Sequence, residues 1–209
     1  MKNRCVIICA SPIIDNEHIK RNVTENDFVI CADAGYITAQ KSNVKFDLIV
    51  GDFDSSQKPK CYDNIIKLPV EKDDTDTFYA LKYAINKGYK DFIILGALGG
   101  RLDHTFANLS ILKYLKDNNC TGVIVDDNTR IYYVEEDKLT VEHKKGKTIS
   151  VFTFGYKECS LTYSGLKYPL KNQTLTNAYP YGISNIVTSD YATIEVHSGG
   201  ALVMIIDKA

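Results

Sequence analysis

Five short runs without a charged or strongly polar residue constrain the fold of this chain more than any other feature. They lie at Cys5–Cys9, Phe28–Ala32, Leu48–Val50, Phe92–Leu95 and Gly122–Val125. A strand with one face in water alternates apolar and polar residues, whereas a strand buried on both faces is apolar throughout. The runs therefore predict strands of a mainly parallel sheet that is covered on both faces.

Helical patterns separate these runs. One extends over Thr75–Lys87, with Asp74 in the position of its N-cap and Gly88 where a helix commonly ends. A second extends over Asp103–Lys116, and a short one covers Gly35–Lys41. The alternation of strands and helices predicts an α/β domain with helices on both faces of the sheet. Ligands of such sheets bind beyond the carboxyl ends of the strands.

The pattern changes after about residue 135. Apolar and polar residues then alternate with period two, which predicts strands at 148–154, 160–163, 193–196 and 201–206. Ser198-Gly199-Gly200, between the last two, is a hairpin-turn signal. We therefore expect an α/β catalytic domain over residues 1–137 and a small antiparallel β-sandwich domain over residues 138–209.

Composition excludes several classes of protein. The chain of 209 residues is 44% hydrophobic, which is enough for a sizeable core, and its net charge of −1 gives no basic surface for nucleic acid. Its six cysteines form no C-x-x-C pair, which favours reduced thiols over a disulfide framework. No N-terminal signal peptide and no membrane-spanning run is present, so we expect a cytoplasmic protein that binds neither membranes nor nucleic acid.

Three acidic clusters fall at the ends of these predicted elements. They read Gly51-Asp52-Phe53-Asp54-Ser55, Lys72-Asp73-Asp74-Thr75-Asp76 and Gly99-Gly100-Arg101-Leu102-Asp103-His104. Carboxylates that converge on one sheet edge repel one another unless a cation lies among them, and carboxylate oxygens suit Mg²⁺. The spacing predicts a magnesium site made by Asp52, Asp54, Asp73 and Asp76.

The same clusters contain groups that suit a polyphosphate. Gly51 allows close backbone approach, Lys72 offers a point charge, and Arg101 can form a fork of hydrogen bonds to phosphate oxygens. Gly99-Gly100 gives a phosphate-cradling turn before a helix. Asp103 can cap that helix or accept a hydrogen bond from a ribose or a substrate hydroxyl, and His104 is either a ligand contact or a polar residue of the helix start.

Each cluster also has a purely structural interpretation. Aspartates stabilise helix N-termini, and paired glycines make tight strand-to-helix turns. No P-loop motif, dinucleotide-binding glycine motif, zinc-ligand spacing or serine-nucleophile elbow occurs in the sequence. The clusters therefore favour magnesium-dependent phosphoryl-type transfer.

Taken together, the clusters resemble those of the thiamine pyrophosphokinase family. The similar pieces, in chain order, are Cys31-Ala32-Asp33-Ala34-Gly35, the three acidic clusters, Gly165-Leu166-Lys167-Tyr168-Pro169-Leu170 and Ser184-Asn185. They span nearly the whole chain. Three differences are Ala34 in place of a glycine, Ala10-Ser11-Pro12 where a glycine is more usual, and Tyr168 where some relatives have tryptophan.

The resemblance implies transfer of the pyrophosphoryl group of ATP to the hydroxyethyl oxygen of thiamine, with release of AMP. It implies Mg²⁺ as cofactor, ATP and thiamine as substrates, and a homodimer with active sites at the subunit interface. Asp33 joins the nucleotide-binding residues, and the magnesium-site aspartates and Asp103 are the catalytic set. Tyr168, Ser184 and Asn185 would bind thiamine, with strand packing and a plain turn as the alternatives.

Two other functions remain open on the residues alone. Acidic clusters that hold Mg²⁺ also serve metal-dependent phosphohydrolases, which would release free phosphate. A nucleotide- or thiamine-binding regulator would keep the fold and bind without turnover. Product identity separates the two enzymes, and binding without release of AMP would favour the regulator.

Overall fold

The computed structural model describes residues 4–11, 15–53, 64–71 and 73–207. Two predicted site residues, Asp54 and Lys72, lie outside these ranges. The chain forms two compact units, Met1–Asp127 and Asn128–Ala209. The boundary expected after residue 137 falls inside the second unit, between β7 (Thr129–Glu135) and β8 (Lys138–Glu142). Within the described part of the chain, no helix has the length and apolar character needed to cross a membrane.

The first unit contains a parallel sheet. Its strands lie in the order β6-β5-β1-β2-β3-β4, with bounds Thr121–Asp126, Asp91–Leu95, Arg4–Ile8, Asp27–Ala32, Leu48–Gly51 and Ile65–Lys67. Every neighbouring pair in this order is parallel. The five predicted runs are all strands, whereas β4 was not predicted because its three residues, none of them fully buried, are too few to form a pattern.

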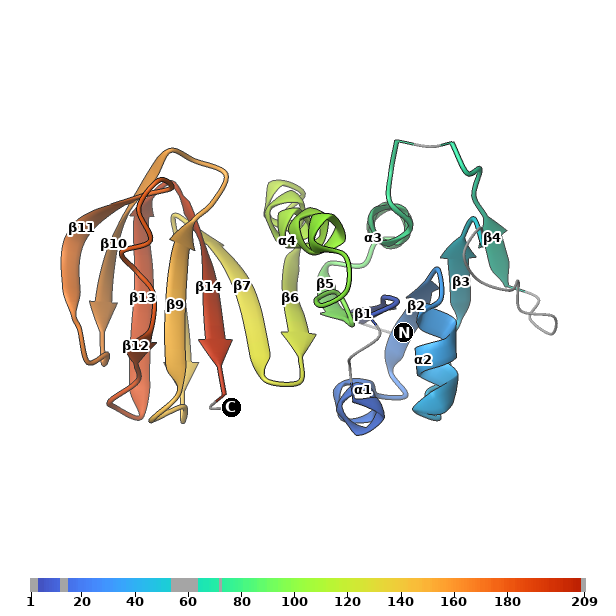
Figure 1. The fold of residues 1–209 in the computed structure, drawn as a ribbon, viewed down its shortest axis with the longest axis horizontal. Coiled ribbons are helices and arrows are strands. Elements are labelled where there is room, and N and C mark those ends of the chain that lie inside the picture. Colours follow the sequence, from blue (N-terminus) through green and yellow to red (C-terminus); the bar gives the residue numbers. More distant parts are fainter. Residues whose placement is uncertain (1–3, 12–14, 54–63, 72, 208–209) are drawn as a thin grey trace. The chain divides into compact units, whose positions relative to one another are not determined.

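Helices cover both faces of this sheet, as predicted (Figure 1). One face packs against α1 (Asn16–Asn22) and α2 (Gly35–Lys41), where Ile19 and Tyr36 join a core with alternate residues of β1 and β2. On the other face, α3 (Asp76–Asn86) contacts β1, β2 and β3, while α4 (Leu102–Asp117) contacts β6. The chain therefore returns across the sheet after β4, and the ends of β1, β2 and β5 come to lie side by side.

The start of α3 differs from the prediction. Thr75, not Asp74, is the N-cap, and its hydroxyl oxygen accepts a hydrogen bond from the backbone N–H of Phe78 at 3.2 Å. Asp74 instead accepts a hydrogen bond from Lys82 Nζ at 2.6 Å. Threonine and aspartate can both cap a helix. Here the carboxylate of Asp74 bonds Lys82 in place of a backbone N–H of the helix start.

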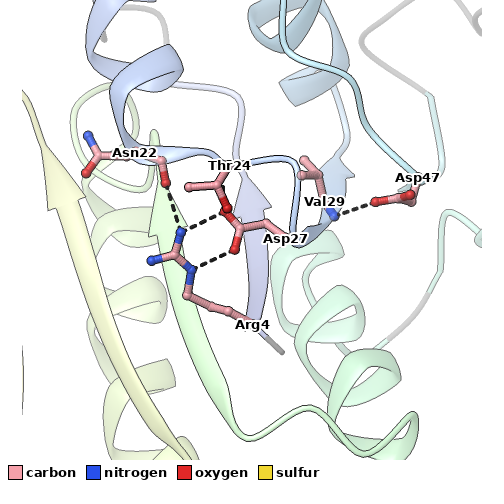
Figure 2. A network of polar contacts seen from close by, with 6 residues as sticks. All are labelled: Arg4, Asn22, Thr24, Asp27, Val29 and Asp47. Carbon is pink, nitrogen blue, oxygen red and sulfur yellow. Dashed lines mark hydrogen bonds and ion pairs between the residues drawn. The ribbon is translucent and has the colours of Figure 1, made fainter. Parts of the chain in front are cut away.

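The amino ends of β1 and β2 are joined by a polar network (Figure 2). Arg4 donates to both carboxylate oxygens of Asp27, from Nε at 2.8 Å and from Nη2 at 2.7 Å. The backbone N–H of Thr24 donates to the same carboxylate at 2.7 Å, and Val29 N–H donates to Asp47 at 2.8 Å. Burial would raise the pKa of Asp27, but the hydrogen bonds from Arg4 and Thr24 outweigh it and lower that pKa.

The second unit is an antiparallel β-sandwich, as predicted. One sheet has the order β12-β9-β14-β7 and the other β11-β10-β13-β8. The strands other than β7 and β8 have the bounds Asn185–Ile186 (β12), Thr148–Thr153 (β9), Gly200–Ile206 (β14), Leu170–Thr176 (β11), Glu158–Ser164 (β10) and Tyr191–Ser198 (β13). Val151 and Val203 of the first sheet share a core with Leu161 and Ile194 of the second.

The turn at Ser198–Gly200 is not a hairpin. β13 pairs with β10 and β8, whereas β14 pairs with β7 and β9, so the turn carries the chain from one sheet to the other. Gly199 has a φ of 73°, and a Cβ there would lie 2.5 Å from the carbonyl oxygen of Glu158. The glycines that suggested a hairpin are therefore required by a tight crossover.

Candidate functional site

A cavity of about 420 Å³ lies at the carboxyl ends of β1, β2 and β5 in the first unit. Six of the predicted site residues line it, namely Asp33, Asp76, Gly99, Gly100, Arg101 and His104. They come from three separated segments of the chain, which the alternating topology brings to one sheet edge. Its lining therefore combines two carboxylates with a guanidinium and a glycine-rich turn.

Asp33 is placed by the register of β2 and β3. Its backbone N–H donates to Val50 O at 2.8 Å, and its φ is 48°, a conformation that is uncommon for a residue other than glycine. Gly51 ends β3, and a Cβ on it would lie 3.2 Å from the Asp33 Cα. The backbones of these two predicted residues therefore approach closely. Uncommon backbone conformations of this kind gather at functional sites.

The second acidic cluster is only partly brought to the cavity. Asp76 is the first residue of α3, is half-buried and lines the cavity. Asp73 is exposed and does not line it, and half-buried Asp52, which follows β3, does not line it either. Asp54, the fourth predicted ligand, lies outside the described residues.

No group of three or more histidine, cysteine, aspartate or glutamate residues with metal-binding geometry occurs within residues 4–11, 15–53, 64–71 and 73–207. The donor types nevertheless fit Mg²⁺. This ion prefers oxygen ligands and keeps several waters, and in kinase-type sites it is held by one or two carboxylates together with substrate phosphates. Asp33 and Asp76 in one cavity satisfy that requirement.

The glycine-rich turn of the third cluster leads from β5 into α4. Gly99 and Gly100 have φ values of 77° and 83°, which exclude most side chains. Arg101 is the N-cap residue of α4, and its side chain makes no capping hydrogen bond. The N-terminus of α4 therefore lies at the cavity edge that Arg101 lines, and a helix N-terminus is a favourable place for an anion.

Arg101 and Asp103 form an exposed ion pair. Arg101 Nε and Nη2 donate to the two carboxylate oxygens of Asp103 at 3.1 and 2.6 Å, and the backbone N–H of His104 adds a bond at 3.0 Å. The hydrogen bond from Arg101 lowers the pKa of Asp103 to about 2. Asp103 lies in the first turn of α4 and is not its N-cap residue. A phosphate that binds Arg101 must compete with the carboxylate of Asp103.

Cys9, Thr77 and Asn108 are among the nine lining residues that were not predicted as site residues from the sequence. Cys9 Sγ lies 3.4 Å from Thr77 Oγ1. Burial raises the pKa of Cys9 to about 11, against the lowering effect of that hydrogen bond, so the thiol is protonated at neutral pH and is a poor nucleophile. Asn108 was hidden because it lies among the apolar residues of α4, where a single polar residue gives no motif.

The predicted thiamine residues lie together in the second unit. Asn185, which is buried, accepts from the backbone N–H groups of Tyr168 at 3.0 Å and Ile186 at 2.9 Å, and donates to Tyr168 O at 2.8 Å. Tyr168 has 58% of its surface exposed, with Lys167 Nζ 5.4 Å from its ring centre. Ser184 has a φ of 58° and its N–H donates to Ser150. Asn185 thus holds the segment that presents the Tyr168 ring.

Comparisons with known proteins point in one direction. A family model described as "Thiamin pyrophosphokinase, catalytic domain" matches residues 19–124, and one described as "Thiamin pyrophosphokinase, vitamin B1 binding domain" matches residues 136–200. The thiamine pyrophosphokinase of Bacillus subtilis is 29% identical over 188 residues, which cover 87% of each chain. Thiamin pyrophosphokinase 1 of Caenorhabditis elegans is 27% identical over 174 residues, or 78% of this chain and 71% of the relative.

The fold is similar to a solved structure as well. The crystal structure of the Bacillus subtilis thiamine pyrophosphokinase superposes with a TM-score of 0.87 at 24% sequence identity, over 99% of this chain and 100% of the other. At this identity the likeness concerns the fold alone. It includes both the parallel sheet with its helices and the antiparallel sandwich.

Proposed function

Because this chain belongs to the thiamin pyrophosphokinase family, we propose that the cavity at the carboxyl edge of its parallel sheet binds ATP and carries the reaction. The chain is a transferase that makes thiamine diphosphate. The hydroxyethyl oxygen of thiamine forms a bond to the β-phosphorus of ATP, the bond from that phosphorus to the α-phosphate oxygen breaks, and AMP leaves. The hydroxyl proton passes to solvent or to a carboxylate.

The lining of the cavity carries this proposal. Pyrophosphoryl transfer is limited mainly by positioning and by neutralisation of charge, with little covalent help from the protein. Gly99 and Gly100 let the backbone approach the polyphosphate, and Arg101 exchanges its bond to Asp103 for a bond to phosphate. Asp33, directly after β2, and Asp76, at the start of α3, then face the polyphosphate.

We propose Mg²⁺ as the cofactor, held by Asp52, Asp54, Asp73 and Asp76, with Asp33 as a further neighbour. When bound, Mg²⁺ neutralises phosphate charge and orients the polyphosphate. The bond from Arg101 lowers the pKa of Asp103, and an aspartate is ionised at neutral pH even without that partner. Asp103 can therefore accept a hydrogen bond from a substrate hydroxyl after Arg101 has turned to the phosphate. Lys72 and His104 complete the proposed phosphate contacts.

For thiamine we propose the Tyr168 ring as the main contact. An exposed aromatic face attracts a cationic ring such as thiazolium. Ser184 and Asn185 are proposed to hydrogen-bond the aminopyrimidine, in the case of Asn185 through the N–H that its bonds to Tyr168 and Ile186 leave over. Tyr168→Ala should raise the KM for thiamine by about 10-fold and leave the KM for ATP unchanged, as steady-state rates at varied substrate would show.

We also propose the domain roles, the compartment and the dimer that the sequence led us to expect. Catalysis is assigned to residues 1–137 and thiamine binding to residues 138–209, in a cytoplasmic homodimer with active sites at the subunit interface. The five described cysteines are buried free thiols, which suits a reducing compartment. Sedimentation equilibrium that gave a monomer at working concentration would remove the dimer from this proposal.

The test of the activity is an incubation with ATP, Mg²⁺ and thiamine, followed by chromatography of nucleotides and thiamine species. We expect AMP and thiamine diphosphate in equal amounts, and only with all three components. ADP or free phosphate as product would favour a kinase or a phosphohydrolase. Thiamine or nucleotide binding without any AMP would favour a regulator.

A further inference from the structure

Asn108 occupies a position where α4 otherwise presents apolar side chains to the core. It is 7% exposed, and its neighbours Leu109, Ile111 and Leu112 are buried as well. A buried amide is costly unless it is hydrogen-bonded. We therefore expect a hydrogen-bond partner for the Asn108 amide, and this partner lies in the loop that leads into α4.

The Asn108 side chain bonds the loop between β5 and α4. Its Nδ2 donates to Ala97 O at 2.8 Å, and Ala97 is 4% exposed. Both residues line the cavity together with Gly99 and Gly100. Ser11 N–H donates to Gly96 O at 3.2 Å, which fixes the start of the same loop. The loop is thus held at Gly96 by Ser11, in the segment after β1, and at Ala97 by α4, just before the two glycines.

We propose that Asn108 is a positioning residue that clamps the β5–α4 loop, so that Gly99, Gly100 and Arg101 keep the conformation that receives the polyphosphate of ATP. This inference rests on the proposed function of the cavity. Three glycines of the loop, Gly96, Gly99 and Gly100, have φ values of 63°, 77° and 83°. Glycines have many accessible conformations, so the loop needs an external bond to favour one of them. The Asn108 amide supplies that bond.

The sharpest variant is Asn108→Asp, which keeps the shape of the side chain and replaces the N–H donor with a carboxylate oxygen that repels Ala97 O. A displacement of about 1 Å in a binding loop can cost up to about 100-fold in rate. We expect the KM for ATP to rise by about 10-fold or more, with the KM for thiamine within about 2-fold of wild type.

The pH dependence of that variant separates positioning from general damage. A protonated carboxyl at position 108 can again donate to Ala97 O, so the defect relative to wild type should shrink as pH falls from 8.5 to 5.5. The other titratable or charged cavity groups, Cys9, Asp33, Asp76, Arg101 and His104, are present in both proteins. The wild-type profile therefore corrects for them, and Asn108→Leu, which has no group to protonate, should show no recovery.

Asn118→Asp is the matched control. Asn118 lies at the far end of α4 and its Nδ2 also donates to a backbone carbonyl, that of Tyr114, at 2.8 Å. It should lose some thermal stability and keep the wild-type KM for ATP. An equal rise in the KM for ATP in this control, or none in Asn108→Asp, would overturn the clamp.

Two further results would count against the clamp. Failure of both Asn108 variants to fold would mean that Asn108 is needed for folding as a whole. A KM defect in Asn108→Asp that did not change with pH would mean that a protonated carboxyl does not restore the bond to Ala97 O. Calorimetric titration with Mg-ATP measures the same weakening without turnover. If wild-type protein binds Mg-ATP but forms no thiamine diphosphate, the proposed function fails while the clamp is still tested by that titration.

Discussion

The two edges of the parallel sheet bear similar side chains and use them differently. At the amino edge, Asp27 accepts from Arg4 and Thr24, and Asp47 accepts from Val29 N–H (Figure 2). At the carboxyl edge, two carboxylates, a guanidinium and paired glycines line one cavity. The amino edge is hollowed too, with about 600 Å³ beside Asp27 and Asp47. Cavity size therefore does not identify the functional edge.

Backbone conformation separates the edges more clearly. Four residues that line the carboxyl-edge cavity have positive φ, namely Asp33, Gly96, Gly99 and Gly100. Among the residues lining the amino-edge hollow, only Asn43, just past the end of α2, has one. Three of the four at the carboxyl edge are glycines, which adopt positive φ readily, so they indicate backbone on which a side chain would be strained. This difference supports our proposal that the carboxyl edge performs the chemistry, whereas the amino edge stabilises the unit.

The largest effect is expected at the carboxyl edge. Asp52→Asn should lower kcat by about 100-fold to 10,000-fold, because loss of a charge from the proposed magnesium-binding cluster would remove several kcal/mol of transition-state stabilisation. Its thermal midpoint should stay close to that of wild type. Steady-state rates and circular dichroism melting check both parts, and a near-normal kcat would mean that Asp52 is not at the reacting centre.

The opposite result is expected at the amino edge. Asp27→Ala removes the partner of Arg4 and of the Thr24 N–H, and its carboxylate is almost fully buried. We expect a loss of about 2–4 kcal/mol in the free energy of unfolding, since breaking a largely buried ion pair leaves unpaired groups. Urea denaturation measures it. A large fall in the kcat of Asp27→Ala, measured at a temperature where the variant is folded, would contradict the separate roles of the two edges.

The acid dependence of stability sharpens the role of Asp27. Its pKa is lower in the folded state than in the unfolded chain. The stabilisation is therefore complete above the unfolded value near 3.8 and is lost as pH falls through the folded value. Urea midpoints of Asp27→Asn should consequently fall less steeply than those of wild type between about pH 5 and pH 2. If the urea midpoints of the two proteins fell equally steeply with pH, Asp27 would not be the source of this acid dependence.

The smallest stability effect is expected for Asp103→Asn. Its ion pair with Arg101 is exposed, and such pairs contribute little to folding. We expect an unchanged thermal midpoint together with a lower kcat, because the proposed role of Asp103 is in the reaction. A clear loss of stability in differential scanning calorimetry would place this residue with Asp27 instead.

The buried strands and the cavity motifs could be predicted from the sequence because each is local. An apolar run such as Phe92–Leu95 needs no tertiary information, and Gly99-Gly100 between a predicted strand and a predicted helix indicates a turn. Asp33 and Asp76 could be predicted to lie at one edge of the sheet because parallel topology places the carboxyl ends of the strands on the same side. These features depend on topology rather than on the details of packing.

Other features depend on tertiary contacts. The helix α1 has only seven residues with Ile19 as its one buried residue, and β11 is mostly exposed, so neither has a clear period. The choice of Thr75 over Asp74 as N-cap depends on Lys82, eight residues after Asp74. Asn108 is recognisable only once its partner Ala97 is in place. The resemblance named Asn185, but its bond to Tyr168 could not be predicted from the sequence.

The most direct test of the division between the edges is the shift of the thermal midpoint by Mg²⁺ and a non-hydrolysable ATP analogue. A ligand present at about 100 times its Kd stabilises the folded protein by about 2.7 kcal/mol. We predict this shift in wild type and, from a lower starting midpoint, in Asp27→Asn, and its loss in Asp52→Asn. An undiminished shift in Asp52→Asn, or its loss in Asp27→Asn, would contradict the assignment of the carboxyl edge to nucleotide binding.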